Sequence, residues 1–357
     1  MTYLSTEFAP RPSLEYPFEK KWSPKAGEPY EVAKGLYWLR VPLPISLDHI
    51  NLWLLEDGDG WVIVDSGYDA SMCKDVWESV FTSFIKSKPV NKIIITHFHP
   101  DHIGLASWLA LRCDCPILIT KGEFNHYQNL VHRDPKALRA QANAFVTQMG
   151  YEADVAEKFV QFMAADDKPA SARVQQSMCE FIQDADELII NGRTWRVVSG
   201  NGHSPEHACL YCSELDVLIS GDQAIPRISS HVGVYPSNRD QDPLGDWLDS
   251  CAKLRDTIPP QTLILPSHQE PFRGIVPRMQ QLIVDHHAQL NRLRLEMDTP
   301  SSPVQARAIL FNRELSVFDT ILATGETLAH LNYLLHRHEL VMQLDELGVA
   351  RYQINQH

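Results

Sequence analysis

The chain has 357 residues, 44% of them hydrophobic, which allows one large domain with an appendage or two domains. Its formal net charge of −13 at pH 7, without a dense Lys/Arg run, disfavours a long polyanion as ligand. The sequence lacks a secretory leader pattern and the ~18 apolar residues of a membrane span, which favours a soluble, cytoplasmic protein with no membrane partner.

Short strand-like runs, rich in β-branched and aromatic residues, alternate with helical segments from Lys34 to about Val276. This alternation indicates a layered α/β domain, with a catalytic domain over residues 1–276. The predicted strands are residues 35–42, 51–67 (a hairpin turning at Asp57 to Gly60), 91–97, 186–200 (a hairpin through Asn191-Gly192), 207–222 (two strands) and 261–268, and residues 69–87 form a predicted helix.

Two segments break this alternation. Residues 121–185 have almost no strand signal and read as an insertion with two helices, separated near Gly150. Apolar side chains on these helices are candidates for a lid over a substrate, although ordinary helix packing explains most of them better. Residues 277–357 predict a helical C-terminal module, with helices at 277–297, 302–310 and 325–349. The candidate lid residues are Phe145, Met149, Phe159, Phe162 and Met163.

The seven cysteines are an odd number without a disulfide-like spacing, so we expect reduced thiols. Cys209 and Cys212 are three residues apart, as in some zinc sites. They lie in a pair of predicted strands, where residues three apart point to opposite faces of the sheet. The sequence therefore predicts two half-buried thiols and no zinc site here.

The stretch "IIITHFHPDHIG" contains the strongest chemical signal. His97 and His99 follow a strand and, two residues apart in extended backbone, point the same way and form half of a metal site. Pro100 favours a helix start, which turns Asp101 and His102 into the same region and supplies donors for a second ion.

Further donors are expected at other strand ends, where α/β folds collect their chemistry. His203 lies in a glycine-rich turn between two strands, Asp222 follows an apolar strand, and His268 ends another. A carboxylate at the position of Asp222 can bridge two cations.

In this order, His-x-His-x-Asp-His, a glycine-flanked histidine, a strand-terminal Ser-Gly-Asp and a strand-terminal histidine resemble the metallo-β-lactamase-fold hydrolase superfamily. The resemblance spans about Lys34 to Val276 and implies a four-layer αββα sandwich. It also implies that Asp65 orients the metal histidines and that His207 is a polar neighbour rather than a ligand. The implied ligands are His97, His99 and His203 for one ion, Asp101, His102 and His268 for the other, and Asp222 as the bridge.

The pattern departs from the best-known true β-lactamases, which lack a histidine matching His102 and have a cysteine in place of the bridging acid. Antibiotic hydrolysis is therefore disfavoured. The pattern is more similar to glyoxalase-II-like thioesterases, quorum-signal lactonases and nucleases. The C-terminal module resembles the winged-helix tail of a group that includes a mitochondrial endoribonuclease, but here Asp345 and Glu346 lie where basic residues would help phosphate contact.

These features predict a hydrolase in which two divalent ions generate a bridging hydroxide, with Asp101 as the residue that accepts the proton of the water. We expect a small or medium thioester, ester or lactone as substrate. A phosphodiesterase or endoribonuclease with the same centre, and a metal-dependent sensor or DNA-binding protein, are the alternatives. Zinc suits the donors, iron and manganese are also compatible, and the helical tail suits a homodimer. Candidate substrate-binding residues are Arg227, His231 and Tyr235.

Overall fold

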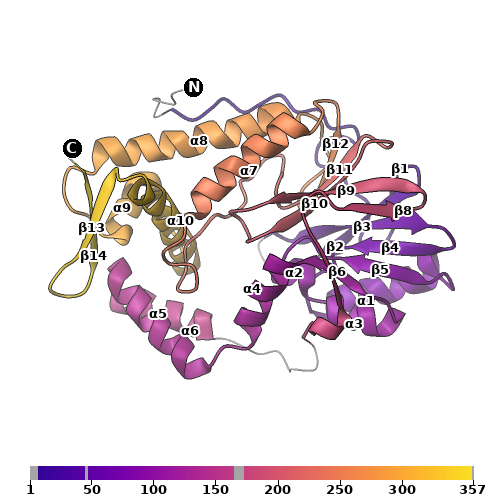
Figure 1. Cartoon of the computed structure of the whole chain (residues 1–357), viewed down its shortest axis with the longest axis horizontal. Coiled ribbons are helices and arrows are strands. Elements are labelled where there is room, and N and C mark those ends of the chain that lie inside the picture. Colours follow the sequence, from indigo (N-terminus) through magenta and orange to yellow (C-terminus); the bar gives the residue numbers. More distant parts are fainter. Residues whose placement is uncertain (1–6, 45–46, 165–172, 356–357) are drawn as a thin grey trace.

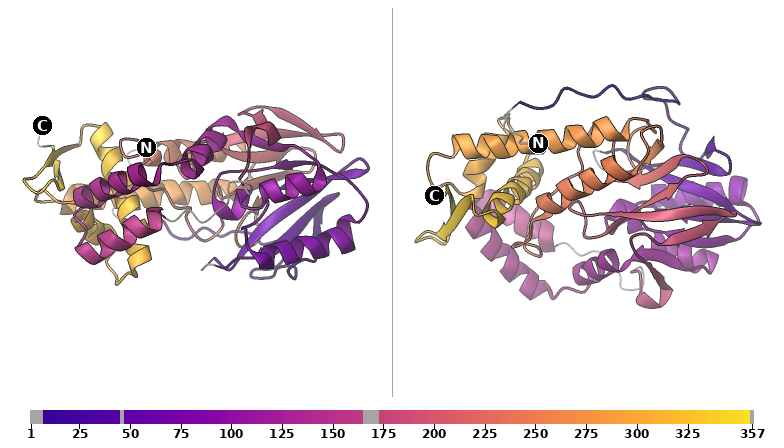
Figure 2. Two further views of the ribbon diagram at one scale, coloured as in Figure 1. Left: turned by 90° about the horizontal axis from the view of Figure 1, so that it is seen from below. Right: turned by 45° about the horizontal axis from the view of Figure 1, so that its top comes forward.

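The computed structural model of the chain describes residues 7–44, 47–164 and 173–355. Within these ranges, two mixed sheets pack face to face, and helices cover the outer face of each (Figure 1). A helical module at the C-terminal end packs beside the sandwich, on the side of the second sheet (Figure 2). These layers confirm the predicted αββα arrangement.

The first sheet has the order β1-β2-β3-β4-β5-β6-β7 over the described residues. Its first four strands are antiparallel to one another, and the pairs from β4 to β7 are parallel. Strand β4 is buried at all five positions, as expected for a strand covered on both faces. The strands are β1 (Tyr30–Ala33), β2 (Leu36–Pro42), β3 (His49–Asp57), β4 (Gly60–Val64), β5 (Val90–Ile94), β6 (Ile117–Thr120) and β7 (Cys179–Ile182).

The second sheet has the order β12-β11-β10-β9-β8 in the described part of the chain, with β11 and β12 parallel and the other pairs antiparallel. Cys209 and Cys212 on β10 face different cores, so the prediction that they do not form a zinc pair is consistent with their placement. The strands are β8 (Glu187–Ile190), β9 (Arg193–Gly200), β10 (His207–Cys212), β11 (Val217–Gly221) and β12 (Leu263–Pro266).

In the part of the chain that the structure describes, three apolar cores separate the layers. Trp38, Trp53 and Trp195 lie between the sheets with the inner faces of both. The first sheet packs its outer face on the helices that carry Trp77 and Leu109, and the second sheet packs on α7 and α8. The helices of the sandwich are α1 (Ser71–Val80), continued by a π-helical turn η1 (Phe81–Ile85), α2 (Pro100–Ile103), α3 (Ala106–Cys113), α4 (Lys121–Val131), η3 (Gln176–Met178) and α7 (Pro243–Thr257).

The insertion and the C-terminal module share one apolar core with the outer face of the second sheet. Phe145, Met149 and Phe159 are nearly or fully buried in this core, so they pack on the module and form no lid. Met163 packs at its edge, and the side chain of Phe162 is outside the described part. The helices are α5 (Pro135–Met149), α6 (Ala153–Ala164), α8 (Ile275–Glu296), α9 (Pro303–Leu310) and α10 (Val317–His336).

Two expectations need correction. Strand β7 lies within the range predicted as a helical insertion, and it extends the first sheet by pairing with β6. The helix predicted over residues 325–349 ends at His336, and β13 (Leu340–Leu344) and β14 (Ala350–Ile354) form an antiparallel hairpin (Figure 1). In the described residues, no helix combines the length and apolarity needed to cross a membrane.

Candidate metal centre

The conspicuous histidine motif folds as its spacing predicts. His97 and His99 lie in the segment after β5, and Pro100 occupies the first turn of α2. Asp101 and His102 are in that same first turn. His97 and His102 have no exposed surface, so their imidazoles face the interior of the site.

One group of donors joins this motif to the turn between β9 and β10. The Nε2 atom of His97 lies 2.9 Å from the Nδ1 atom of His99. The ring of His203 lies 4.6 Å from that of His99 and 5.0 Å from that of His97. One nitrogen from each of these three residues falls within 4.8 Å of the others, which suits a single ion.

A second group lies beside the first. The Nε2 atom of His268, which follows β12, lies 3.4 Å from Oδ2 of Asp101. The Nε2 atom of His102 lies 3.7 Å from the same oxygen. The donor atoms of Asp101, His102 and His268 are all within 4.8 Å of one another.

Asp222 lies between the two groups, at the end of β11. Its Oδ1 is 3.6 Å from Nε2 of His102 and 3.4 Å from Nε2 of His268. Its other oxygen, Oδ2, is 3.5 Å from Nε2 of His203 in the first group. The two oxygens therefore face different donor groups, an arrangement in which this carboxylate could bridge two ions.

Four buried donor atoms have no hydrogen-bond partner among the described residues: Nε2 of His102, of His203 and of His268, and Oδ1 of Asp222. Buried polar atoms are almost always satisfied, so four such atoms converging on one place require another partner. Their spacing and chemistry fit divalent cations bound by imidazole and carboxylate. The His/Asp clusters are thus capable of binding metal ions.

Charge supports the same conclusion. Burial opposes protonation of His102, but the carboxylates of Asp65, Asp101 and Asp222 raise its pKa well above the ordinary value. His268 shows the same balance, with its pKa raised to about 10 by Asp222 and Asp101 against the effect of burial. The carboxylates therefore favour additional positive charge at this point.

The outward nitrogens of these histidines are fixed by hydrogen bonds. His102 Nδ1 donates to Oδ2 of Asp65 at 2.8 Å. His203 Nδ1 donates to the carbonyl of His231 at 2.7 Å, and His268 Nδ1 donates to that of His49 at 2.9 Å. Each bond leaves Nε2 as the free electron-pair donor, which is the tautomer that a metal site needs.

Asp65 holds a candidate ligand from behind through a hydrogen bond. It follows β4 with a left-handed φ of 62°, a conformation that aspartate tolerates better than most residues. Besides holding His102, its carboxylate accepts the backbone N–H of Thr96 at 2.8 Å and the hydroxyl of the same residue. Asp65 therefore orients one candidate ligand and the chain that leads to two others.

His207 lies against the site without pointing a free donor into it. Its Nε2 accepts the backbone N–H of Asp222 at 3.1 Å, and its ring stacks on that of His97 at 4.8 Å. Gly221 has a φ of +52°, and a Cβ there would lie 2.3 Å from Nε2 of His207. Glycine is therefore required for this close approach.

Glu123 is a residue that sequence reasoning missed. It is fully buried on α4, where Oε2 accepts the N–H of Phe98 and Oε1 accepts the hydroxyl of Ser204 and the N–H of Glu206. Burial raises its pKa to about 7, against these hydrogen bonds. It ties the His97–His99 segment to the turn carrying His203. A lone glutamate in a helix gives no sequence signal for such a role.

The three candidate substrate residues lie on the segment that follows Asp222. His231 Nε2 lies 2.7 Å from the hydroxyl of Tyr235, and its Nδ1 lies 3.8 Å from Oε2 of Glu326 on α10. Arg227 forms an ion pair with Glu270, two residues after His268. Of the three, only His231 is shown to contact a candidate ligand, and it does so through its carbonyl.

Comparisons with known proteins agree with this geometry. Residues 45–268 match the family profile described as the metallo-beta-lactamase superfamily. The chain belongs to the metallo-beta-lactamase superfamily. Residues 290–355, from the last part of α8 to β14, also match the profile described as the metallo-beta-lactamase-like C-terminal domain.

Several superfamily relatives extend over most of the chain. A beta-lactamase domain protein from Burkholderia ambifaria is 38% identical, with a TM-score of 0.83, and the match covers 96% of this chain and 97% of that one. A metallo-beta-lactamase family protein from Thermus thermophilus is 26% identical, with a TM-score of 0.73 over 91% of this chain and all of the other. The probable metallo-hydrolase YqjP of Bacillus subtilis is 22% identical over 83% of this chain and 91% of its own length. Superfamily membership supports a metallo-hydrolase.

Proposed function

We propose that the chain is a dinuclear metal-dependent hydrolase that acts on a small or medium thioester, ester or lactone. The observation that carries the proposal is Asp222, whose two oxygens face two different groups of unsatisfied donors. A mononuclear site needs no such bridge. His97, His99 and His203 would hold one cation, and Asp101, His102 and His268 would hold the other.

Two bound divalent cations, zinc being the expected metal, would lower the pKa of a water molecule towards ~7 and polarise the carbonyl of the substrate. In the hydrolysis, the water oxygen forms a bond to the acyl carbon, and the bond from that carbon to sulfur or oxygen breaks. The water supplies the hydroxyl of the new acid and the proton of the released thiol or alcohol.

We assign to Asp101 the role of accepting the proton of the attacking water. Burial opposes its ionisation, but the neighbouring imidazoles of His102 and His268 lower its pKa to about 2. Its carboxylate therefore stays ionised at neutral pH and can accept a hydrogen bond from the attacking water. Orienting the water in this way raises the fraction of productive encounters.

The acyl substrate class is favoured over RNA by charge. The overall charge of −13 repels a polyanion, and the turn between β13 and β14 carries Asp345 and Glu346. A hairpin that contacted a nucleic-acid backbone would present basic residues there.

The test is a side-by-side assay of metal-loaded protein on acyl thioesters, esters and lactones, and on single-stranded RNA. We expect chelator-sensitive hydrolysis of at least one acyl class, with a rate that rises with pH to a plateau as the attacking water ionises. Rapid, salt-sensitive RNA cleavage without acyl turnover would contradict the proposal and favour the endoribonuclease alternative. Metal binding without turnover of any substrate would favour a sensor.

A further inference from the structure

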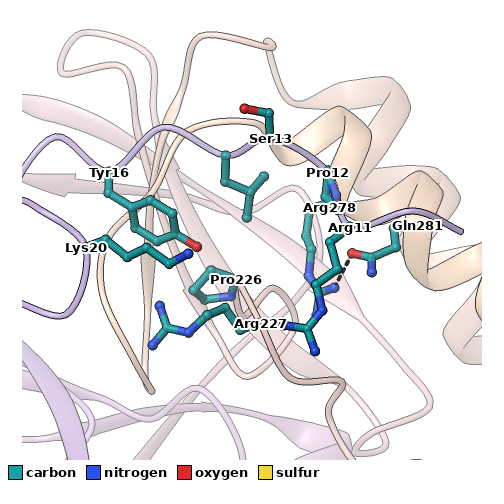
Figure 3. A pocket seen from close by; sticks show the side chains of 10 residues that line it. Arg11, Pro12, Ser13, Tyr16, Lys20, Pro226, Arg227, Arg278 and Gln281 are labelled. Carbon is teal, nitrogen blue, oxygen red and sulfur yellow. Dashed lines mark hydrogen bonds between the residues drawn. The ribbon is translucent and has the colours of Figure 1, made fainter.

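A cavity lies outside the donor groups, between the N-terminal segment and the start of α8 (Figure 3). Its volume is about 260 Å³. One wall is the extended segment from Arg11 to Lys20, and the other is formed by the segment after Asp222 and by α8. The lining residues are Arg11, Pro12, Ser13, Leu14, Tyr16, Lys20, Pro226, Arg227, Arg278 and Gln281.

The lining of this cavity is strongly basic. Arg11, Lys20, Arg227 and Arg278 line it, and none of its described lining residues is acidic. Glu270 pairs with Arg227, and the field of Asp285 acts on Arg278, which leaves an excess of positive charge. In a chain with a net charge of −13, such a concentration of cations favours an anionic ligand at this point.

Arg278 is the fixed part of the cavity. It is 3% exposed, and its Nε and Nη2 donate to the carbonyls of Ile225 and Ile228 at 2.7 and 2.6 Å. Its Nη1 donates to Oε1 of Gln281 at 2.6 Å, the contact dashed in Figure 3. These three hydrogen bonds go to neutral oxygens, so they hold the guanidinium at the cavity and leave its positive charge in place.

Arg11 and Lys20 are the adaptable part. Both are exposed, and Lys20 Nζ lies 5.6 Å from the ring of Tyr16, with the guanidinium of Arg227 at 6.0 Å from the same ring. Within the described ranges, Arg11 forms no ion pair. Two cations on an N-terminal segment can thus close on a ligand that enters beside Tyr16.

The cavity is joined to the metal centre through the backbone. Pro226 and Arg227 follow Asp222 by four and five residues. The N–H of Arg227 donates to Oε1 of Gln269 at 3.0 Å, and Gln269 follows His268 directly. The same wall therefore extends from both strand ends that supply candidate ligands, which suits a substrate that spans the two places.

We propose that this cavity binds a phosphate group of the substrate, so that the enzyme acts on acyl compounds whose carrier part ends in a phosphate or pyrophosphate. This inference rests on the proposed hydrolase function for its catalytic part only. Guanidinium groups and an ammonium group can donate hydrogen bonds to the several oxygens of a phosphate. A phosphate dianion is also attracted more strongly to the positively charged cavity than a carboxylate, which carries one negative charge.

The binding part is tested without any turnover. Calorimetric titration of the metal-loaded, full-length protein with inorganic pyrophosphate should show saturable binding. The double variant Arg11→Ala/Lys20→Ala should weaken it by at least about tenfold, as expected for the loss of two charge-assisted contacts. Arg313→Ala, which removes an exposed arginine on the loop after α9, is the matched control and should bind as wild type does.

Asp222→Ala separates this cavity from the metal ions, which can also attract pyrophosphate. Binding that persists in Asp222→Ala and weakens in the double variant supports the proposal. Binding that is lost in Asp222→Ala and unchanged in the double variant overturns it, because pyrophosphate would then be held by the metals.

The substrate part is tested with S-acetyl-4′-phosphopantetheine and S-acetylpantetheine, which share the thioester and differ only in the terminal phosphate. Wild type should prefer the phosphorylated thioester in kcat/KM, mainly through KM, and the double variant should lose most of that preference. Equal kcat/KM for the two in wild type overturns the substrate assignment. Absence of turnover of both compounds contradicts the thioesterase function, whereas the pyrophosphate titration still decides the cavity.

Discussion

Single residues at this centre serve two partners at once. His102 gives one ring nitrogen to Asp65 and leaves the other facing Asp101 and Asp222. Asp222 gives one oxygen to each donor group and its N–H to His207. Replacing a candidate ligand should therefore change the metal content of the protein. Replacing a residue that only hydrogen-bonds to a ligand should instead change the orientation of that ligand.

Asp222→Ala tests the bridge. Removing both carboxylate oxygens would leave each ion short of one ligand. It would also remove the negative charge that lies between the two ions. We expect a loss of at least one ion per chain and a fall in kcat/KM of at least about 100-fold. Metal analysis of purified protein and steady-state kinetics measure this, and full metal content with normal turnover would refute the assignment.

His207→Ala is the informative comparison, because His207 touches Asp222 and His97 without offering a free nitrogen to the ions. We expect this variant to retain both ions when metal is in excess. Loss of one ion in His207→Ala as complete as in Asp222→Ala would make His207 a ligand.

Glu123→Gln tests the tie between two ligand-bearing segments. The carboxylate accepts hydrogen bonds from three donors. In the glutamine variant the NH2 group replaces one of the accepting oxygens, so a donor would face a donor there. We expect a loss of about 1–3 kcal/mol in the free energy of unfolding and weaker metal binding. Urea unfolding and metal titration measure this. Glu152→Gln, at an exposed position directly before α6, is the control, and equal effects of the two variants would exclude a role of Glu123 in linking the two segments.

At the scale of elements, the sequence predicted what local patterns encode. Alternating apolar runs identified β2 to β5 and β8 to β12, and Pro100 marked the start of α2. Strand β7 was missed because Cys179–Ile182 is short and half exposed, so only its pairing with β6 makes it a strand. Strand β13 was read as part of the helix predicted over residues 325–349 because its leucines also fit a helical period, whereas the turn of Asp345 to Gly348 pairs it with β14.

The sequence also did not predict which polar side chains are buried or which residues they contact across the fold. His286 on α8 is buried, with its Nδ1 atom 3.2 Å from Nε2 of His330 on α10. Neither sequence position signals this contact, because the packing of α8 on α10 is set by the whole module. The metal motif could be predicted because its donors are contiguous or lie at strand ends, where the backbone alone sets direction.

Phe159→Ala tests whether the insertion is core or lid. The ring of Phe159 is fully buried and stacks on that of Phe145 at 5.4 Å. We expect a loss of about 3–5 kcal/mol in the free energy of unfolding, with KM unchanged in the protein that remains folded. Lys158→Ala, on the exposed neighbouring position, should change neither quantity. A large rise in KM without destabilisation would support the interpretation of the insertion as a lid over the substrate.

At the scale of the whole molecule, the boundary at residue 276 does not separate independent cores. The second sheet, α7, the insertion and α8 to α10 bury one continuous set of apolar side chains. Asn332 on α10 donates to the carbonyls of Arg239 and Gln241 in the segment that leads to α7. The C-terminal module therefore supports the segment that carries His231, whose carbonyl fixes His203.

A chain ending at residue 276 tests this dependence. It would expose the outer face of the second sheet and of α7, so we expect an aggregating or molten product that binds a hydrophobic dye and holds no stoichiometric metal. Circular dichroism, dye binding and metal analysis measure it. A cooperative thermal transition with full metal content would show that residues 1–276 fold alone.

The claim that two ions share Asp222 is tested most directly by X-ray absorption spectroscopy of metal-free protein reconstituted with Zn²⁺. The account predicts saturation at two ions per chain, nitrogen and oxygen scatterers only, and a metal–metal separation of about 3.5–4 Å. Saturation at one ion, or sulfur among the scatterers, would contradict a dinuclear centre built on these histidines and aspartates.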